Sequence, residues 1–252
     1  MRTPASSSGL KVRVAKTYAA MSSQAADIVC EELKKRPDMV FCLSAGGTPT
    51  GLYQELVKRQ IRNPKPFRRF CAMGVDEWGG LPAGSPGTCQ ADLENKLLDP
   101  MKVKRSRRRL FRSSSPSLER ECERMARWLG ANGPIDVCIL GLGLNGHVAM
   151  NEPNRVLTPH THVATLARSS SHHPMLKSLS RKPRYGLTLG LHDILSSRKI
   201  LLLVSGEAKR SILQKLLRSQ ITTFLPASFL WLHPDATVLC DQAALGANRP
   251  NL

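Results

Sequence analysis

Short, uninterrupted apolar runs alternate with helix-forming segments along most of this chain. The apolar runs fall at residues 39–44, 70–75, 135–141, 185–189, 200–204 and 237–240. Segments with the apolar spacing of helices fall at residues 17–35, 49–59, 88–98, 117–131 and 208–217. Strands that are apolar on both faces and separated by helices form a parallel sheet that is covered on both sides. The pattern therefore predicts an α/β fold with a mostly parallel sheet and helices on both faces.

The length and composition of the chain favour a single folded domain. A chain of 252 residues fits one α/β domain, and 41% hydrophobic against 22% charged residues excludes disorder as its overall state. We expect this domain over residues 11–246, flexible tails at 1–10 and 247–252, and a loosely structured segment at 102–116. No run approaches the roughly 20 apolar residues of a membrane-spanning helix, so no membrane partner is expected.

The seven cysteines are scattered, odd in number and never spaced C-x-x-C. Several lie inside apolar runs, as Cys42 and Cys138 do. Buried, reduced thiols explain this distribution better than disulfides or zinc ligands. Because reduced thiols are typical of a reducing compartment, and the first nine residues lack the apolar stretch of a secretory signal, we expect a cytoplasmic protein.

The chain carries a large positive charge, with 37 Lys and Arg against 19 Asp and Glu, a formal net charge of +18. No acid lies between Asp99 and Glu119, and residues 102–112 hold seven cations. An excess of this size attracts polyanions, so a nucleic-acid binder is one hypothesis. No nucleic-acid module is recognisable, however, and aromatic residues for base stacking make up only 5%. We therefore expect no specific nucleic-acid partner.

Three turns that carry reactive or ligand-binding residue types follow predicted strands. The first runs from Ser44 through Gly46, Gly47 and Thr48 to Pro49 and joins a strand to a helix. Its glycines allow backbone N–H groups to approach an anion closely, and the helix N-terminus favours negative charge. The turn therefore indicates phosphate binding, with an ordinary tight strand-to-helix connection as the alternative.

The second turn begins with two adjacent carboxylates, Asp76 and Glu77, at a strand end. Side chains of neighbouring residues diverge in an extended chain, so only one of them readily faces a cleft. A carboxylate in that position can move a proton between adjacent carbons of a bound sugar. The alternative is a helix-capping or salt-bridged aspartate.

The third turn, residues 141–153, holds Gly143, Asn145, His147 and Glu152. An imidazole with polar neighbours is suited to proton transfer near neutral pH, although a structural loop histidine is the alternative. The glycine spacing resembles a dinucleotide-binding motif only superficially, because no acid follows about 20 residues later. No nicotinamide cofactor is therefore expected.

A lysine and the remaining histidines complete the candidates. Lys209 lies at the opening of a predicted helix, where a cation can hold a phosphate, although an exposed helical lysine is the commoner case. The other histidines show no recurring metal-ligand spacing; they are residues 160, 162, 172, 173, 192 and 233. We expect no metal.

Taken together, these turns resemble those of the glucosamine-6-phosphate deaminase and 6-phosphogluconolactonase superfamily. The matching segments run in order through most of the chain: Gly46-Gly47-Thr48-Pro49, Asp76-Glu77-Trp78, Gly143-x-Asn145-Gly-His147, Asn151-Glu152-Pro153, Leu187-Thr188-x-Gly190 and Ser205-Gly206-Glu-x-Lys209. The Asn-Glu-Pro segment resembles the deaminase and isomerase branch. Pro86-Gly-Thr-Cys89 and residues 226–233 are most similar to proteins labelled galactosamine-6-phosphate isomerase.

The resemblance implies a Rossmann-like fold and a cofactor-free isomerisation and deamination of an amino-sugar 6-phosphate, galactosamine 6-phosphate being favoured. It implies that Asp76 moves a proton between C2 and C1, that His147 opens the sugar ring, and that Glu152 orients and charges the imidazole. It implies that Gly46, Gly47, Thr48 and Lys209 hold the phosphate. The residues expected to bind the substrate as a whole, phosphate and sugar, are Ser44, Gly46, Gly47, Thr48, Gly143 and Lys209. A glucosamine-6-phosphate deaminase, a 6-phosphogluconolactonase-type hydrolase and a non-catalytic sugar-phosphate sensor are the alternatives.

Two positions depart from the family pattern. Asn145 stands where the deaminases have aspartate, and an amide at this position is expected to hydrogen-bond the imidazole without stabilising its charged form. The phosphate-binding arginine of the family has Arg168 as its nearest counterpart, within an acid-free segment, residues 160–184, where the family carries a mobile lid. The sequence is also compatible with a homo-oligomer.

Overall fold

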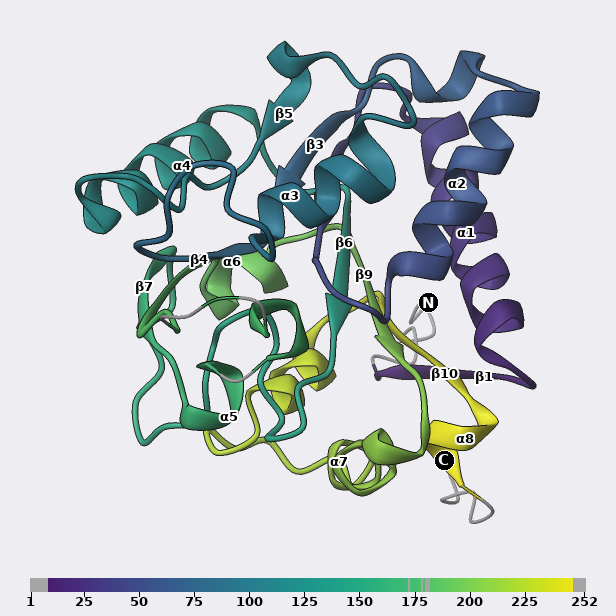
Figure 1. Cartoon of the computed structure of the whole chain (residues 1–252). Helices are drawn as coiled ribbons and strands as arrows, with labels where there is room; N and C mark the ends of the chain where they lie inside the picture. The colour runs from purple at the N-terminus through teal and green to yellow at the C-terminus, as the bar shows by residue number, and fades with distance from the viewer. Residues whose placement is uncertain (1–8, 172, 178, 180–181, 247–252) are drawn as a thin grey trace, which may run out of the picture.

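A parallel sheet of seven strands forms the centre of the computed structural model, which describes residues 9–246 except 172, 178, 180 and 181 (Figure 1). Every neighbouring pair of strands in this sheet is parallel. Their order across the sheet is β1 (Lys11–Ala15), β10 (Ala236–Asp241), β9 (Lys199–Val204), β6 (Val137–Gly141), β2 (Val40–Leu43), β3 (Cys71–Gly74) and β5 (Arg108–Arg109).

The order of the strands creates a crevice between β2 and β6. From β2 the chain adds β3 and β5 on one side, and then returns to add β6, β9 and β10 on the other. At such a switch point the connections leave in opposite directions, and ligands bind beyond the carboxyl ends of the strands. The turn after β2 and the turn after β6 are two of the three turns identified above.

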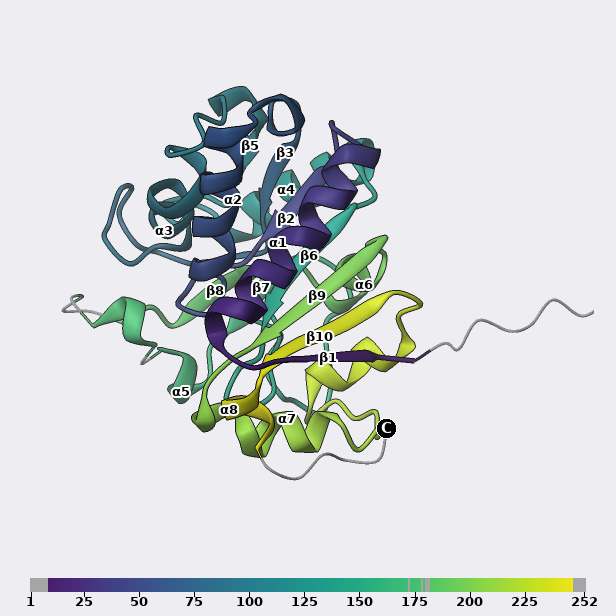
Figure 2. The ribbon, with the colours of Figure 1, turned by 90° about the vertical axis from the view of Figure 1, so that its right-hand side faces the viewer.

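Helices cover both faces of this sheet, as predicted. Side chains of the strands alternate between the faces, so that Phe41 and Leu43 pack on one side while Val40 and Cys42 pack on the other. The first side is covered by α1 (Tyr18–Lys35), α2 (Thr50–Arg62) and α3 (Cys89–Leu93). The second side is covered by α4 (Leu118–Asn132), α6 (Leu191–Leu195), α7 (Arg210–Leu216) and α8 (Gln242–Leu245). Both views show α1 and α2 lying side by side (Figures 1 and 2).

A smaller antiparallel sheet lies beside the carboxyl ends of the large one. It consists of β4 (Asp76–Trp78), β8 (Tyr185–Thr188) and β7 (His162–Thr165). Only Val75 separates β3 from β4, so the chain passes directly from one sheet to the other. Asp76 therefore begins a new strand at the edge where the parallel strands end.

Three local predictions need correction. The expected N-terminal tail, residues 1–10, includes Leu10, which is buried in the core directly before the edge strand β1 and its pairing with β10. The segment 102–116, expected to be loose, contains β5 next to β3, because Arg108 forms ion pairs with Glu94 and Asp99 and thereby anchors it. The helix expected over 88–98 is α3 followed by a wider π-helical turn, η2 (Glu94–Leu98).

Residues 1–8 and 247–252, which make up most of the two expected tails, lie outside the described residues. Within the part of the chain that is described, no helix is both long enough and apolar enough to cross a membrane.

Candidate functional site

A cavity of about 450 Å³ lies where the three turns meet. Nine of the ten residues predicted for the site line it: Ser44, Gly46, Gly47, Thr48, Asp76, Gly143, His147, Glu152 and Lys209. The tenth, Asn145, lies behind the cavity lining and contacts Glu152. Segments that are up to 165 residues apart in sequence therefore share one space, because the parallel strands end at the same edge of the sheet.

Asp76 is the first residue of β4 and presents its carboxyl group to this cavity. Burial raises the pKa of the carboxyl to about 6, although His147 and a hydrogen bond with the Cys89 thiol act to lower it. Trp78, two residues further along the strand, lies on the same face and also lines the cavity. A carboxyl group with this pKa is ionised, and hence basic, near neutral pH.

Glu77 points the opposite way and ties β4 to α3. Its carboxylate accepts hydrogen bonds from the backbone N–H groups of Trp78, Cys89 and Gln90, at 2.8, 2.8 and 2.7 Å. Burial raises the pKa of this carboxyl to about 7, against the effect of the three donors. As predicted from strand alternation, only one carboxylate of the pair, that of Asp76, faces the cavity. The carboxylate of Glu77 holds β4 and the start of α3 together.

His147 is held by a small polar network on one side of its ring. Its Nδ1 lies 3.4 Å from Glu152 Oε2 and 3.4 Å from the hydroxyl of Ser170, a residue of α5 (Arg168–Ser171). Burial acts to raise the pKa of Glu152, but its contacts with His147, Ser170 and Asn145 outweigh burial and lower it. Glu152 is therefore an ionised partner for the imidazole, as a proton-transfer histidine requires.

Gly143 makes room for the imidazole. A Cβ atom at this position would lie 2.5 Å from both Cδ2 and Nε2 of His147. Non-bonded carbon atoms do not approach so closely, so the ring would have to move. The backbone N–H of Gly143 donates to His147 O at 2.9 Å. Gly143 thus shapes the loop around the histidine. It lines the cavity, but its amide is engaged within the loop.

Asn145 does not contact the imidazole ring in the way expected from the sequence. Its Oδ1 accepts from the backbone N–H of His147 at 3.2 Å, and its Nδ2 donates to Glu152 Oε2 at 2.7 Å. The amide therefore acts through the loop and through Glu152. An uncharged side chain here removes the repulsion that a second carboxylate would exert on Glu152.

The turn after β2 carries the candidate anion site. Gly46 adopts a φ of 109°, which favours glycine, and its N–H donates to Asp92 Oδ2 at 2.9 Å. The Gly46 amide is thus engaged, and the expectation that both glycine amides face an anion needs correction. The amides of Gly47 and Thr48 have no hydrogen-bond partner among the described residues.

Lys209 approaches the same cavity from the turn after β9. Its Nζ donates to Leu142 O at 2.6 Å, and burial lowers the pKa of its amino group. The two remaining donor positions of the ammonium group can reach a ligand. Arg168, the nearest counterpart of the family arginine, lies at the start of α5 and is exposed, and it does not line the cavity.

Several residues that line the cavity were not among the predicted site residues. They are Trp78, Cys89, Ser170, His173 and Met175. Trp78 shares a strand face with Asp76 and could have been found from that spacing, whereas the others reach the cavity only through tertiary packing. Burial lowers the pKa of His173, and His147 and Lys209 lower it further, so this imidazole is neutral. His172, its neighbour in sequence, lies outside the described residues.

Within the part of the chain that the structure describes, three buried polar atoms of the cavity lining have no hydrogen-bond partner: Ser44 Oγ, Trp78 Nε1 and Glu152 Oε1. Unpaired buried polar atoms are costly, and they are commonly satisfied by a ligand or by water. Their side chains come from three separate turns, yet all three line the same space. Among the described residues, no group of three or more His, Cys, Asp and Glu could hold a metal ion.

Comparison with known proteins identifies the family of this chain. The profile of the family described as glucosamine-6-phosphate isomerases/6-phosphogluconolactonase matches residues 13–239. The chain is 37% identical over 218 residues to the candidate deaminase AgaI of Escherichia coli K12, covering 86% of each chain. It is 35% identical over 237 residues to glucosamine-6-phosphate deaminase 1 of Bacillus subtilis 168, covering 93% of this chain and 98% of that one.

Solved structures show the same relationship at the level of the fold. A structure described as a monomeric glucosamine-6-phosphate deaminase superposes with a TM-score of 0.88 at 34% identity, covering 94% of this chain and all of the other. A 6-phosphogluconolactonase from Trypanosoma brucei shares the fold, with a TM-score of 0.72 at 19% identity and coverage of 94% and 98%. The chain belongs to the glucosamine-6-phosphate isomerase/6-phosphogluconolactonase family, and the relatives in Bacillus subtilis and in the first solved structure are named glucosamine-6-phosphate deaminases.

Proposed function

We propose that this protein converts an amino-sugar 6-phosphate and water into a ketose 6-phosphate and ammonia, without a cofactor. The observation that carries this proposal is the meeting of Asp76, His147 and Lys209 with the Gly47–Thr48 turn in one cavity. A base, an imidazole and an anion site within one space of about 450 Å³ suit a single hexose phosphate.

His147 would begin the reaction by opening the sugar ring. Proton transfer through the imidazole moves the C1 hydroxyl proton to the ring oxygen, which breaks the C1–O5 bond and leaves an aldehyde at C1. Glu152, ionised and 3.4 Å from Nδ1, stabilises the imidazole while it carries the proton. Nε2, on the far side of the ring, is then the nitrogen that exchanges the proton.

Asp76 would carry out the isomerisation. Its carboxylate takes the proton from C2 while the C1 oxygen gains a proton from solvent, which gives an enolamine. The carboxyl group then returns its proton to C1 while the amine nitrogen gives a proton back to solvent, so that the aldehyde becomes an alcohol and the C2 amine becomes an imine. Water then adds to C2 and ammonia leaves, which produces the ketone. A carboxyl group whose pKa is about 6 can both accept and return a proton near neutral pH.

The phosphate group would anchor the substrate at the other end of the cavity. The free amides of Gly47 and Thr48 and the ammonium group of Lys209 are donors suited to a phosphate. Binding energy from this remote group would hold C1 and C2 beside Asp76.

We further propose galactosamine 6-phosphate as the preferred substrate. The support lies in residues 86–89 and 226–233, which resemble proteins labelled galactosamine-6-phosphate isomerase. Several relatives at 32–36% identity are named glucosamine-6-phosphate deaminases, so glucosamine 6-phosphate is the direct alternative.

A coupled assay that measures ammonia from both epimers under identical conditions tests this proposal. We expect release from both, with the larger kcat/KM for galactosamine 6-phosphate. A larger kcat/KM for the gluco epimer would reverse the substrate assignment. If the folded protein releases no ammonia from galactosamine 6-phosphate and none from glucosamine 6-phosphate, the proposed activity is wrong.

A further inference from the structure

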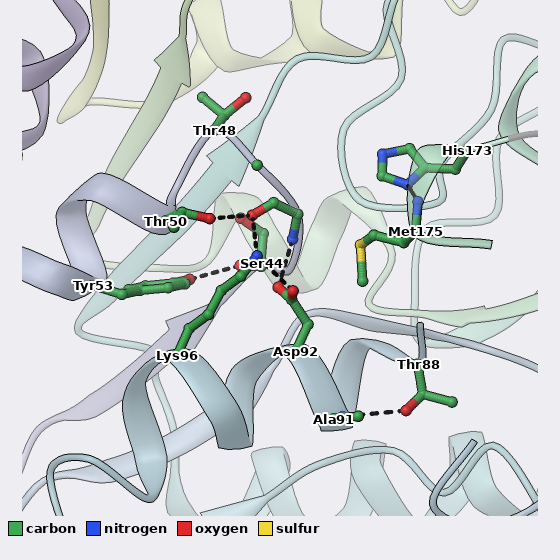
Figure 3. A network of polar contacts seen from close by, with 12 residues as sticks. Ser44, Thr48, Thr50, Tyr53, Thr88, Ala91, Asp92, Lys96, His173 and Met175 are labelled. Carbon is green, nitrogen blue, oxygen red and sulfur yellow. Dashed lines mark hydrogen bonds and ion pairs between the residues drawn. The ribbon is translucent and has the colours of Figure 1, made fainter. Parts of the chain in front are cut away.

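The backbone at Gly46 is held by three side chains, two of them at its carbonyl and one at its amide. Gly46 O accepts hydrogen bonds from Lys96 Nζ at 3.0 Å and from Thr50 Oγ1 at 2.9 Å, and Gly46 N donates to Asp92 Oδ2. Figure 3 shows Asp92 and Lys96 extending from their helix to this turn, with Thr50 approaching from α2. None of the three side chains lines the cavity, so the Gly46 carbonyl points away from it.

The next peptide is held in the same way by Tyr18. Its hydroxyl lies 3.1 Å from both Gly47 O and Thr48 O, to which it donates, and it accepts from Gly51 N at 2.7 Å. Tyr18 is the first residue of α1 and does not line the cavity. Three successive carbonyl groups of the turn, those of Gly46, Gly47 and Thr48, are therefore bound by side chains that do not line the cavity.

The direction of these carbonyls fixes the direction of the free amides. In a trans peptide the C=O of one residue and the N–H of the next point in opposite directions. Because the carbonyls of Gly46 and Gly47 point away from the cavity, the N–H groups of Gly47 and Thr48 point toward it. Two adjacent amides aimed at one space form a concave site for an anion.

Asp92 and Lys96 also cancel each other's charge close to this site. Lys96 Nζ lies 2.5 Å from Asp92 Oδ1, and both side chains are largely buried. Asp92 alone would repel a phosphate bound one or two residues away, and Lys96 offsets that repulsion. The pair thus engages both the N–H and the C=O of Gly46 at no net charge.

We propose that Tyr18, Asp92 and Lys96 are positioning residues for a phosphate monoester, which they serve by presetting the Gly46–Thr48 backbone so that the amides of Gly47 and Thr48 face it. This inference rests on the proposed function, since it assumes that the turn receives the substrate phosphate. Such residues act on binding, because the geometry that they hold is complete before the ligand arrives.

Titration of the whole protein with inorganic phosphate tests the positioning role directly. We expect Lys96→Met to weaken phosphate binding about tenfold and Tyr18→Phe severalfold, because each removes one of the hydrogen bonds that hold a carbonyl whose direction aims an amide. Lys96→Arg keeps a cationic donor and should recover most of the affinity. In turnover, Lys96→Met should raise KM by a similar factor and change kcat less than about twofold.

Two control variants separate positioning from loss of charge or of a hydroxyl. Lys58→Met removes the same charge from an exposed ion pair with Glu55 on α2, and Tyr185→Phe removes a hydroxyl from an exposed tyrosine. Both should bind phosphate as the unaltered protein does. If Lys96→Met and Tyr18→Phe match these controls, or if the unaltered protein binds no phosphate, the inference is wrong.

The same measurements distinguish this inference from the proposed function. Phosphate binding that depends on Lys96, in a protein that releases no ammonia from either amino-sugar phosphate, would contradict only the proposed function. Ammonia release that is equally efficient in Lys96→Met and in the unaltered protein would contradict only the positioning role.

Discussion

The imidazole of His147 lies so close to Gly143 that a methyl group at position 143 would come within 2.5 Å of ring Nε2. The ring and the backbone of this loop therefore depend on each other. Nε2 is also the nitrogen that we assign to proton exchange with the sugar. A change at Gly143 should accordingly affect catalysis before it affects folding.

Gly143→Ala is expected to displace the imidazole and to reduce kcat at least tenfold, because a shift of about 1 Å in a catalytic group can cost two orders of magnitude in rate. The measurement is steady-state ammonia release, with the melting temperature recorded alongside. Gly130→Ala is the matched control, since a Cβ at this exposed position of α4 meets nothing within 4 Å. The control should be as active as the unaltered protein and equally or more stable. Normal turnover in Gly143→Ala would contradict the role given to the ring.

The pH dependence of the reaction should report Asp76. Its pKa is raised to about 6, and the group must be ionised to act as a base, so kcat/KM should fall as the pH drops through 6, approaching tenfold per unit below it. Glu152 has a lowered pKa and stays ionised over this range. The profile should be measured with the melting temperature at each pH, which separates titration from unfolding. A profile that stays flat down to pH 5 would exclude a base with this pKa.

Asn145→Asp should place two carboxylates against each other, because Asn145 Nδ2 now lies 2.7 Å from Glu152 Oε2. Two like charges at that distance hold a proton between them, which raises the pKa of the pair and removes charge from the partner of His147. We expect activity at pH 6.5 to fall severalfold relative to activity at pH 8.5, more than in the unaltered protein. Asn132→Asp adds the same charge at the exposed end of α4 and should leave the profile unchanged. Superimposable profiles for Asn145→Asp and the unaltered protein would show that position 145 does not act through Glu152.

The indole groups of Trp78 and Trp231 differ in a way that predicts opposite phenotypes. Trp231 Nε1 donates to Leu216 O at 2.9 Å, whereas the buried Nε1 of Trp78 has no partner among residues 9–246 as described, and its side chain lines the cavity. Replacement of either by Phe removes similar volume, and only at Trp231 does it also break a hydrogen bond between described residues. Trp231→Phe should lose about 1 kcal/mol more stability than Trp78→Phe, and only Trp78→Phe should raise KM. Denaturant unfolding and kinetics of both variants provide the test; equal losses of stability would mean that both N–H groups are bonded.

The sheet and the three functional turns were predictable because each depends on local sequence. The buried strands β2, β6 and β9 are continuous apolar runs, and the rule that ligands bind beyond the carboxyl ends of parallel strands brought Asp76, His147 and the Gly46 turn together. The family resemblance, carried by the same turns, is confirmed by the family profile over residues 13–239.

Features that depend on tertiary contacts were not predictable. Strand β5 consists of only two arginines and has no apolar residue. It is therefore recognised only by its pairing with β3. The engagement of the Gly46 amide depends on Asp92, a residue 46 positions away on another helix. Asn145 was expected to hydrogen-bond the imidazole of His147. In the folded loop its side chain instead contacts Glu152 and the backbone N–H of His147, and these contacts cannot be read from the sequence.

Parallel measurement of ammonia release and phosphate affinity in Asp76→Asn and His147→Gln tests the central claim most directly. The claim is that one cavity binds the phosphate group of an amino-sugar phosphate at one end and carries out the reaction at C1 and C2 of the sugar at the other end. Both variants should lose at least about a hundredfold in kcat with amino-sugar 6-phosphates, yet bind inorganic phosphate no more weakly than the unaltered protein. Turnover within tenfold of normal in either variant would contradict the assigned chemistry. Loss of phosphate binding in a folded variant would contradict the separation of the two ends of the site.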